Sequence, residues 1–192
     1  MNKNASFATT KINLLATLSI ICILLHACAP LKHKVASTTP LILYEAIPDA
    51  SEKKSLRGIL TIAQITTDTA FGWYAQNAQY FHPDSAVVQA IRKNKEKAQI
   101  VIFGGTWCHD TQQLLPKYFT TLQAANFPLQ SLTLIGVDRA KTTIGNLHKI
   151  FNITNVPTLI VLVNGTEKGR IVEFGKTGYV DKELAEIFDE LK

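Results

Sequence analysis

The nine residues Phe103-Gly104-Gly105-Thr106-Trp107-Cys108-His109-Asp110-Thr111 join an apolar run to a helical pattern. The apolar run, Ile100–Phe103, predicts a buried strand, and the spacing of apolar residues from about 109 to 125 predicts a helix. Cys108 therefore lies at a helix N-terminus, where unpaired backbone N–H groups and the helix dipole favour an anion. For cysteine that anion is the thiolate, which is the nucleophilic form. We expect Cys108 to be the reactive residue of the chain.

Strand and helix patterns alternate on both sides of this junction. We expect strands at 56–65, 100–103, 131–137, 158–163 and 170–174, and helices near 84–91, 109–125, 144–151 and 184–191. Pro116 removes one backbone donor from the second of these helices and should kink it. Asn164-Gly165 predicts a hairpin turn between the last two strands. The order predicts an α/β fold in which helices connect parallel strands and an antiparallel hairpin closes the sheet.

Five aromatic residues between positions 71 and 81 follow no clear period: Phe71, Trp73, Tyr74, Tyr80 and Phe81. Aromatic side chains more often fill cores than line sites, so we expect them to pack over the sheet. The alternative is that they line a surface beside the Cys108 turn.

Trp107-Cys108-His109-Asp110-Thr111 resembles the Trp-Cys-x-x-Cys motif of thioredoxin-like proteins, with Thr111 in place of the second cysteine. Pro116 follows Cys108 by eight residues, as the helix-kinking proline of that family does. Val156-Pro157-Thr158 precedes an apolar strand and is similar to the family's loop, whose proline is cis and packs beside the active cysteine. The resemblance spans roughly 99–192 and implies a thioredoxin-like three-layer α/β sandwich. Its mixed sheet would contain parallel strands and a C-terminal antiparallel hairpin.

More narrowly, the chain is similar to membrane-anchored thioredoxin-family proteins of bacterial envelopes with a Trp-Cys-x-Asp-Thr site. Two departures limit what this implies. The second cysteine is absent, and Ile102 stands where the family usually has a buried aspartate that assists proton transfer. The dithiol chemistry of thioredoxin therefore cannot be transferred whole.

Thr111 lies one helical turn after Cys108, and we expect its hydroxyl either to hydrogen-bond the thiolate in a catalytic role or simply to pack in the first turn. His109 adds positive charge when it is protonated, whereas the Asp110 carboxylate disfavours the thiolate. Trp107 supplies an apolar flank for a substrate, or it packs over the turn.

In the family, the loop that corresponds to Val156-Pro157-Thr158 forms the opposing side of a substrate groove. The resemblance implies that Pro157 is cis and that the backbone of Val156 pairs with an extended substrate segment. Trp107, His109, Asp110 and this loop are therefore the substrate-binding residues that we predict around the thiol.

The leading hypothesis is single-cysteine thiol–disulfide exchange. Cys108 can attack a disulfide or a sulfenic acid, and an external thiol must then resolve the mixed disulfide because the chain offers no second cysteine in the motif. The expected partners are protein thiols or disulfides and that external thiol. The alternative is a non-catalytic binding or chaperone-like module that docks partners through the Val156-Pro157 groove, with Cys108 as an inert packing residue.

Other classes of function lack their sequence features. The formal net charge of +5 is modest, and no basic stripe interleaved with aromatic residues indicates a nucleic-acid partner. Adjacent Cys108 and His109 cannot form a tetrahedral metal site alone, so we expect neither a metal nor another cofactor. Motifs of a Ser-His-Asp hydrolase, a phosphate-binding loop and a dinucleotide fingerprint are absent from the sequence.

Residues 1–27 are typical of a bacterial lipoprotein signal peptide. Lys3 and Lys11 form a positive region, and the almost wholly apolar stretch 12–25 follows. Leu25-His26-Ala27-Cys28 then resembles the lipobox at which a cysteine is lipidated, although His26 departs from the usual small or apolar residue. Alternatives are an uncleaved membrane anchor and an ordinary signal cleaved nearby.

On the lipoprotein interpretation, Cys22 leaves with the signal and Cys28 carries the lipid, so Cys108 is the remaining free thiol. We expect residues 28–55 to form a tether, in which Leu41–Tyr44 can add an edge strand, and residues 56–192 to form the thioredoxin-like domain. The protein would then be lipid-anchored in the bacterial envelope and face the periplasm or the exterior.

Overall fold

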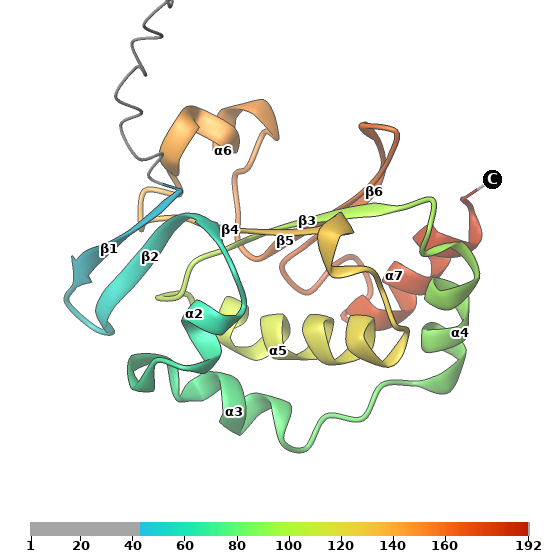
Figure 1. Cartoon of the computed structure of the whole chain (residues 1–192), viewed down its shortest axis with the longest axis horizontal. Coiled ribbons are helices and arrows are strands. Elements are labelled where there is room, and N and C mark those ends of the chain that lie inside the picture. The colour runs from blue at the N-terminus through green and yellow to red at the C-terminus, as the bar shows by residue number, and fades with distance from the viewer. Residues whose placement is uncertain (1–42, 192) are drawn as a thin grey trace, which may run out of the picture. The chain divides into compact units, whose positions relative to one another are not determined.

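A computed structural model of the chain describes residues 43–191, which belong to one compact unit, Leu41–Lys192. The predicted signal peptide, Cys22 and the lipidation site Cys28 lie outside the described residues. The strands are β1 (Tyr44–Asp49), β2 (Lys53–Leu60), β3 (Gln99–Gly104), β4 (Leu132–Gly136), β5 (Thr158–Val163) and β6 (Thr166–Val172) (Figure 1). The helices are α2 (Ala63–Thr66), α3 (Trp73–Ala78), α4 (Ser85–Asn94), α5 (His109–Ala124), α6 (Leu147–Ile150) and α7 (Val180–Asp189), with short 3-10 helices at Thr69–Phe71, Leu129–Ser131 and Ile144–Asn146.

The six strands form one mixed sheet in the order β1-β2-β4-β3-β5-β6. β3 and β4 run parallel, and the other four neighbouring pairs are antiparallel. The mixed sheet is confirmed, although one pair, rather than several, is parallel among the described residues. Because β3 and β4 are parallel, their carboxyl ends, Gly104 and Gly136, meet at the same edge of the sheet. The Cys108 turn leaves the sheet at this edge.

Helices cover both faces of the sheet, which gives the expected three layers. Figure 1 shows α3, α4, α5 and α7 on one side and α6 on the other. The larger apolar core lies between the sheet and α4, α5 and α7, and it includes Ile100, Ile102, Leu115, Leu159 and Phe188. A smaller cluster on the α6 side includes Phe103, Ile135, Val156 and Ile160, with Trp107 and Cys108 packed against it. The Cys108 turn is therefore anchored on the α6 face.

Local sequence signals explain several elements. The side chain of Asp84 accepts a hydrogen bond from the Ala86 N–H and caps α4. α5 begins directly after Cys108 and continues through Pro116. Asn164 and Gly165 have φ angles of 51° and 74°, the positive values that a two-residue hairpin turn requires. β6 therefore starts at Thr166, earlier than the expected residue 170.

The tether prediction for residues 28–55 is wrong from Tyr44 onward. β1 and the first part of β2 occupy this range, so the ordered domain begins before residue 56. β1 is an edge strand whose residues alternate between exposed and half-buried, and it contains Pro48. Edge strands tolerate proline and need little apolar sequence, which explains why the pattern looked like a linker.

Two other expected elements are shorter than predicted. The strand expected at 56–65 ends at Leu60 and gives way to α2. The helix expected at 144–151 is interrupted because Gly145 and Asn146 adopt positive φ angles of 72° and 56°, which an α-helix does not contain. Only the four residues of α6 follow them.

The five clustered aromatic residues do not share one environment. Phe71 is buried in the larger core, and Trp73 and Tyr74 pack against it, so the core prediction is right for these three. Tyr80 is 80% exposed, which contradicts that prediction.

Among residues 43–191, no helix has the length and apolar character needed to cross a bilayer.

Candidate functional site

The turn between β3 and α5 is built around two glycines. A Cβ atom on Gly104 would lie 2.9 Å from Thr111 Cγ2, and one on Gly105 would lie 2.6 Å from Trp107 Cε2. Real Cβ contacts are not that short, so both positions need glycine for space. The Cys108 N–H donates to the Gly105 carbonyl at 2.8 Å, which closes the turn. Cys108 then occupies the N-cap position of α5 with φ −89° and ψ 122°.

The thiol of Cys108 is half-buried and faces the loop before β5. Its Sγ donates a hydrogen bond to the Val156 carbonyl oxygen, 3.2 Å away. The Val156–Pro157 peptide bond is cis, as expected. Val156 is 2% exposed and Pro157 is buried, so the carbonyl that meets the sulfur is held by packed residues. Cys108 is the one free cysteine among the described residues.

Thr111 is 1% exposed, and its hydroxyl oxygen accepts a hydrogen bond from the Gly105 N–H at 3.2 Å. None of the hydrogen bonds in the described part of the chain joins Thr111 to Cys108. The observed role of Thr111 is thus to hold the glycine turn and to pack against Gly104.

Trp107 is fixed over the turn from two directions. Its Nε1–H donates to the Val137 carbonyl at 2.9 Å, and the Arg139 guanidinium lies over its ring, 5.1 Å from the centroid. Arg139 is held in turn by two hydrogen bonds to the Asp49 carboxylate, at 2.8 and 2.9 Å, and by one to Ser51. The Arg139 guanidinium lowers the pKa of Asp49 well below its usual range, so this carboxylate remains charged near neutral pH.

The other predicted site residues differ in their exposure. His109 is exposed, and its Nε2 lies 2.7 Å from Gln113 Nε2. Asp110 is half-buried in the first turn of α5. Thr158 is 1% exposed and its hydroxyl donates to the Asn155 carbonyl, so this side chain stabilises the loop from within and is not available to a substrate.

Arg139, Asp49 and Gln112 were missed by the sequence interpretation. Gln112 Nε2 donates to the Thr106 carbonyl at 3.0 Å and ties the first turn of α5 to the loop before it. Arg139 follows the carboxyl end of β4, and the parallel pairing of β3 and β4 brings it to the Cys108 edge. The position of Arg139 directly after a predicted strand could therefore have placed it at this edge from sequence. Asp49 could not be placed, because it lay in the range that we had interpreted as a tether.

The arrangement presents a single half-exposed sulfur at a helix N-terminus, flanked by Trp107 and the Val156-Pro157 loop. No group of three or more His, Cys, Asp or Glu side chains suited to a metal ion occurs within residues 43–191. The reactive group that this arrangement presents is the Cys108 thiol.

Comparison with known proteins gives one family match. The family model of thioredoxin matches residues 81–186, more than half of the chain. Among solved structures, a protein of unknown function from Pseudomonas aeruginosa is 15% identical, with 67% of this chain and 83% of that chain covered and a TM-score of 0.45. Thioredoxin from Fasciola hepatica is 17% identical, with 51% and 88% covered and a TM-score of 0.35. Oxidised thioredoxin O2 from Arabidopsis thaliana is 24% identical, with 57% and 86% covered and a TM-score of 0.35. No curated protein sequence matches the chain.

Proposed function

The chain belongs to the thioredoxin family, and from this premise we propose that it performs thiol–disulfide exchange with Cys108 as its single nucleophile. The observation that carries the proposal is the position of the sulfur. Cys108 is the N-cap residue of α5 and is partly exposed. A helix N-terminus favours the thiolate that such exchange requires.

In the first step, the Cys108 thiolate attacks one sulfur of a substrate disulfide. The bond between Cys108 and that sulfur forms as the substrate S–S bond breaks, and the other substrate sulfur leaves as a thiolate that takes up a proton. An external thiol then attacks the mixed disulfide and releases the substrate as a thiol. Cys108 is then joined to the external sulfur in a new disulfide. A second external thiol attacks that disulfide and releases Cys108 as a thiol. In total, two external thiols are oxidised to one disulfide as one substrate disulfide is reduced.

The Val156 carbonyl couples the state of the sulfur to the groove. Cys108 Sγ donates to this oxygen at 3.2 Å, and only the protonated sulfur can do so. When the thiolate forms, that hydrogen bond is lost and the carbonyl becomes available to an N–H group of an extended substrate.

The two departures from the family motif define the limits of the activity. Thr111 cannot attack a mixed disulfide, so release depends on the external thiol. Ile102 is fully buried in β3, and it supplies no carboxylate to move a proton. We therefore propose a slow exchange protein that holds covalent intermediates, whose partners are protein thiols or disulfides.

For the location of this activity we propose the bacterial envelope, with a lipid on Cys28 as the anchor. Support comes from the sequence of residues 1–28 alone, in which two lysines, an apolar stretch and Leu25-His26-Ala27-Cys28 follow one another. Such a compartment also suits a partly exposed thiol that reacts with disulfides, because disulfides persist there.

A second candidate function is a non-catalytic binding module that uses the same groove. The hydrogen bonds of Cys108 to Val156 and of Thr111 to Gly105 favour it, because both side chains already have partners within the protein. In that case Cys108 would be a packing residue on the α6 face of the sheet.

The two functions predict opposite reactivity for one sulfur. The test is the rate at which Cys108 reacts with an aromatic disulfide reagent, measured in the folded protein and in the same protein unfolded in urea. The Cys108→Ser variant, measured in parallel, subtracts the reaction of the other cysteines. Exchange predicts a faster reaction in the folded protein, and a folded rate below the unfolded rate would favour the binding module.

A further inference from the structure

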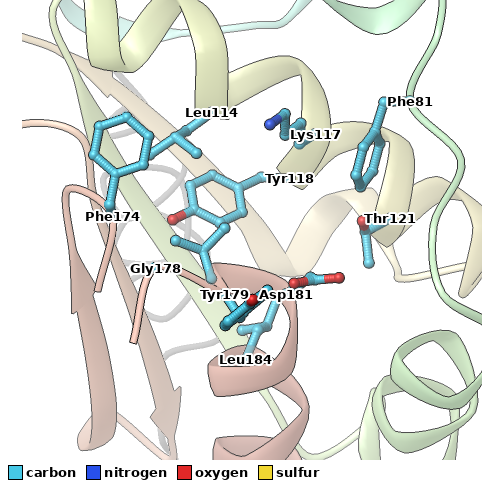
Figure 2. Close-up of a pocket in the computed structure, with 11 residues that line it drawn as sticks. Phe81, Leu114, Lys117, Tyr118, Thr121, Phe174, Gly178, Tyr179, Asp181 and Leu184 are labelled. Carbon is cyan, nitrogen blue, oxygen red and sulfur yellow. The ribbon is translucent and has the colours of Figure 1, made fainter. Parts of the chain in front are cut away.

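Two cavities of about 270 and 590 Å³ are lined without the Cys108 turn. The first lies between α5 and the start of α7, and Figure 2 shows Phe81, Leu114 and Phe174 around it. The second is lined by residues of α2, α3, α5 and β4. Neither lining includes any of residues 104–111. A disulfide substrate of Cys108 is therefore recognised by side chains on the surface beside the sulfur.

Arg139 is an exposed cation on the Trp107 side of that sulfur. Its side chain is 51% exposed, and its guanidinium lies over the Trp107 ring, 5.1 Å from the centroid. Trp107 directly precedes Cys108, and both residues pack against the same apolar cluster on the α6 side of the sheet. The guanidinium covers part of the indole, so a substrate that approaches from this side meets Arg139.

The Asp49 carboxylate fixes the orientation of this guanidinium. The Asp49 side chain is 3% exposed and accepts hydrogen bonds from Arg139 Nε and Nη2 at 2.8 and 2.9 Å. Asp49 is held in turn by the N–H groups of Ser51 and Glu52, at 3.0 and 3.2 Å. The third guanidinium nitrogen, Nη1, donates no hydrogen bond within residues 43–191. Because the guanidinium is planar and rigid, its Nη1–H groups have a defined direction and are free for an acceptor.

The charges around Arg139 favour an uncharged acceptor. The hydrogen bond to Asp49 raises the pKa of Arg139, and the Glu52 carboxylate adds to the rise. One guanidinium thus faces two carboxylates, so a third carboxylate on a substrate would gain little net attraction. A main-chain carbonyl oxygen is an uncharged acceptor that every peptide carries, and small disulfides without amide groups lack it.

We propose that Arg139 selects peptide disulfides for exchange at Cys108, by donating from Nη1 to a main-chain carbonyl oxygen that flanks the substrate cysteine. This inference rests on the proposed exchange function and names its substrate class, an extended peptide disulfide in preference to a small organic disulfide. Asp49 is a positioning residue, since it acts through Arg139. It belongs to β1, which lies before the residues 81–186 that match the thioredoxin family.

The test compares two substrates in single-turnover exchange with the purified protein. One is the symmetrical disulfide of a blocked Ala-Ala-Cys-Ala-Ala peptide, and the other is hydroxyethyl disulfide, which has no amide group. Mass spectrometry of the Cys108 adduct gives a half-saturating concentration and a limiting rate for the peptide and a rate constant for both substrates.

In Arg139→Met, the ratio of the peptide rate constant to the hydroxyethyl disulfide rate constant should fall by about tenfold, the usual effect of losing one hydrogen bond from a charged donor. The fall should come from the half-saturating concentration rather than the limiting rate, because the carbonyl is not a reacting group. Lys168→Met also removes one positive charge, from β6 at the opposite edge of the sheet from β1, and it should leave the ratio unchanged.

A second variant and a second set of substrates apply if Arg139→Met does not fold. Arg139→Lys keeps the charge, but an ammonium group cannot hold Asp49 and a carbonyl in one planar fork, so the ratio should fall there as well. In the wild type, each carbonyl oxygen of the peptide is replaced in turn by sulfur, a weaker acceptor. At one position the half-saturating concentration should rise several-fold, and this rise should disappear in the Arg139 variant.

The outcomes separate this inference from the function on which it rests. If the wild type reacts with neither disulfide at Cys108, the exchange function is wrong and the inference falls with it. If the wild type reacts, but both Arg139 variants leave the ratio unchanged, only the selection by Arg139 is wrong. That selection is also overturned if no carbonyl replacement matters. It is overturned as well if glutamate in place of one alanine improves the peptide only when Arg139 is present, since the acceptor would then be a carboxylate.

Discussion

Gly105 sits beneath the indole of Trp107, and the two residues fix each other. An added Cβ would lie 2.6 Å from Trp107 Cε2, so Gly105→Ala must displace the ring. The displaced ring loses its hydrogen bond to Val137 and its contact with Arg139. We expect the variant to be less stable by about 1–3 kcal/mol, the usual cost of overpacking. Urea unfolding measures the stability, and the near-ultraviolet circular dichroism should lose the signal of an ordered tryptophan.

Gly72→Ala is the matched control for this change. A Cβ at Gly72 would lie 3.8 Å from its nearest neighbour, and the residue has a helical φ of −54°. Alanine suits that conformation, so the control should keep the wild-type stability and dichroism. If Gly105→Ala behaves like the control, the packing of Trp107 on the turn is not what the structure indicates.

Thr111→Cys should supply the internal thiol that the motif lacks. Position 111 lies on the first turn of α5 after Cys108, so the new sulfur can attack a mixed disulfide there. We expect a gain of disulfide reductase activity when a reductant is supplied, and this gain should be partial because Ile102 offers no carboxylate. The rate of insulin disulfide reduction is a suitable measurement. Thr111→Ser keeps a hydroxyl without a thiol, and an equal gain in that control would refute the explanation.

The central residue of the site could be predicted from sequence, but the residues that hold it could not. A cysteine between an apolar strand and an amphipathic helix has a local pattern, and this pattern placed Cys108 at the start of α5. Asp49 reaches Arg139 across 90 positions of sequence, and no local pattern reports such a contact. The hydrogen bond from Cys108 to Val156 spans 48 positions. We could predict that these residues lie close together from the resemblance to a known motif, but not from the spacing of apolar residues.

At the scale of elements, the β1–β2 hairpin is joined to the end of β4 by the pair of Asp49 and Arg139. The lowered pKa of Asp49 means that its contribution to stability is fully present above the unfolded pKa of about 3.9 and is lost as the pH falls through the folded value. Arg139→Met removes the main cause of this shift. We expect the variant to be less stable than the wild type near pH 7, and the difference should shrink as the pH falls below about 4. Urea unfolding across this pH range measures it.

Lys168→Met is the matched control for loss of one positive charge. Lys168 is exposed on β6 and forms no ion pair within residues 43–191. Its substitution should change stability little and without this pH dependence. A difference between Arg139→Met and the wild type that stays constant down to about pH 2 would contradict the assignment, since Asp49 would then not be its source.

Helices and strands with a regular spacing of apolar residues could be predicted from the sequence. An exposed edge strand and a helix interrupted by positive φ angles could not. β5 is a continuous apolar strand and α5 has a long amphipathic face, so both were predicted within a few residues of their observed bounds. β1 is an exposed edge strand, and its sequence resembles a linker. The helix expected at 144–151 had the correct apolar spacing, but Gly145 and Asn146 interrupt it with positive φ angles that apolar spacing does not reveal.

At the scale of the whole molecule, the proposed anchor can be tested without reference to the described residues. Leu25-His26-Ala27-Cys28 follows an apolar stretch, and lipidation requires the Cys28 sulfur. In a bacterial host, Cys28→Ser should release the protein from membranes or block its processing, whereas Cys22→Ser should leave both unchanged because Cys22 lies within the signal. Membrane fractionation and the size of the mature protein measure the effect. A Cys28→Ser protein that stays with membranes at the processed length would refute lipidation.

The proposed exchange depends on a reactive Cys108 sulfur with no second cysteine in its motif to resolve a mixed disulfide. The most direct measurement blocks free thiols in cells that contain the protein and separates their extracts on non-reducing gels. The wild type should migrate as larger, covalent complexes that disappear on reduction and are absent from Cys108→Ser, because without a second cysteine in the motif the mixed disulfides persist until an external thiol arrives. If the wild type and Cys108→Ser give the same bands, Cys108 does not exchange with disulfides and the central claim is wrong.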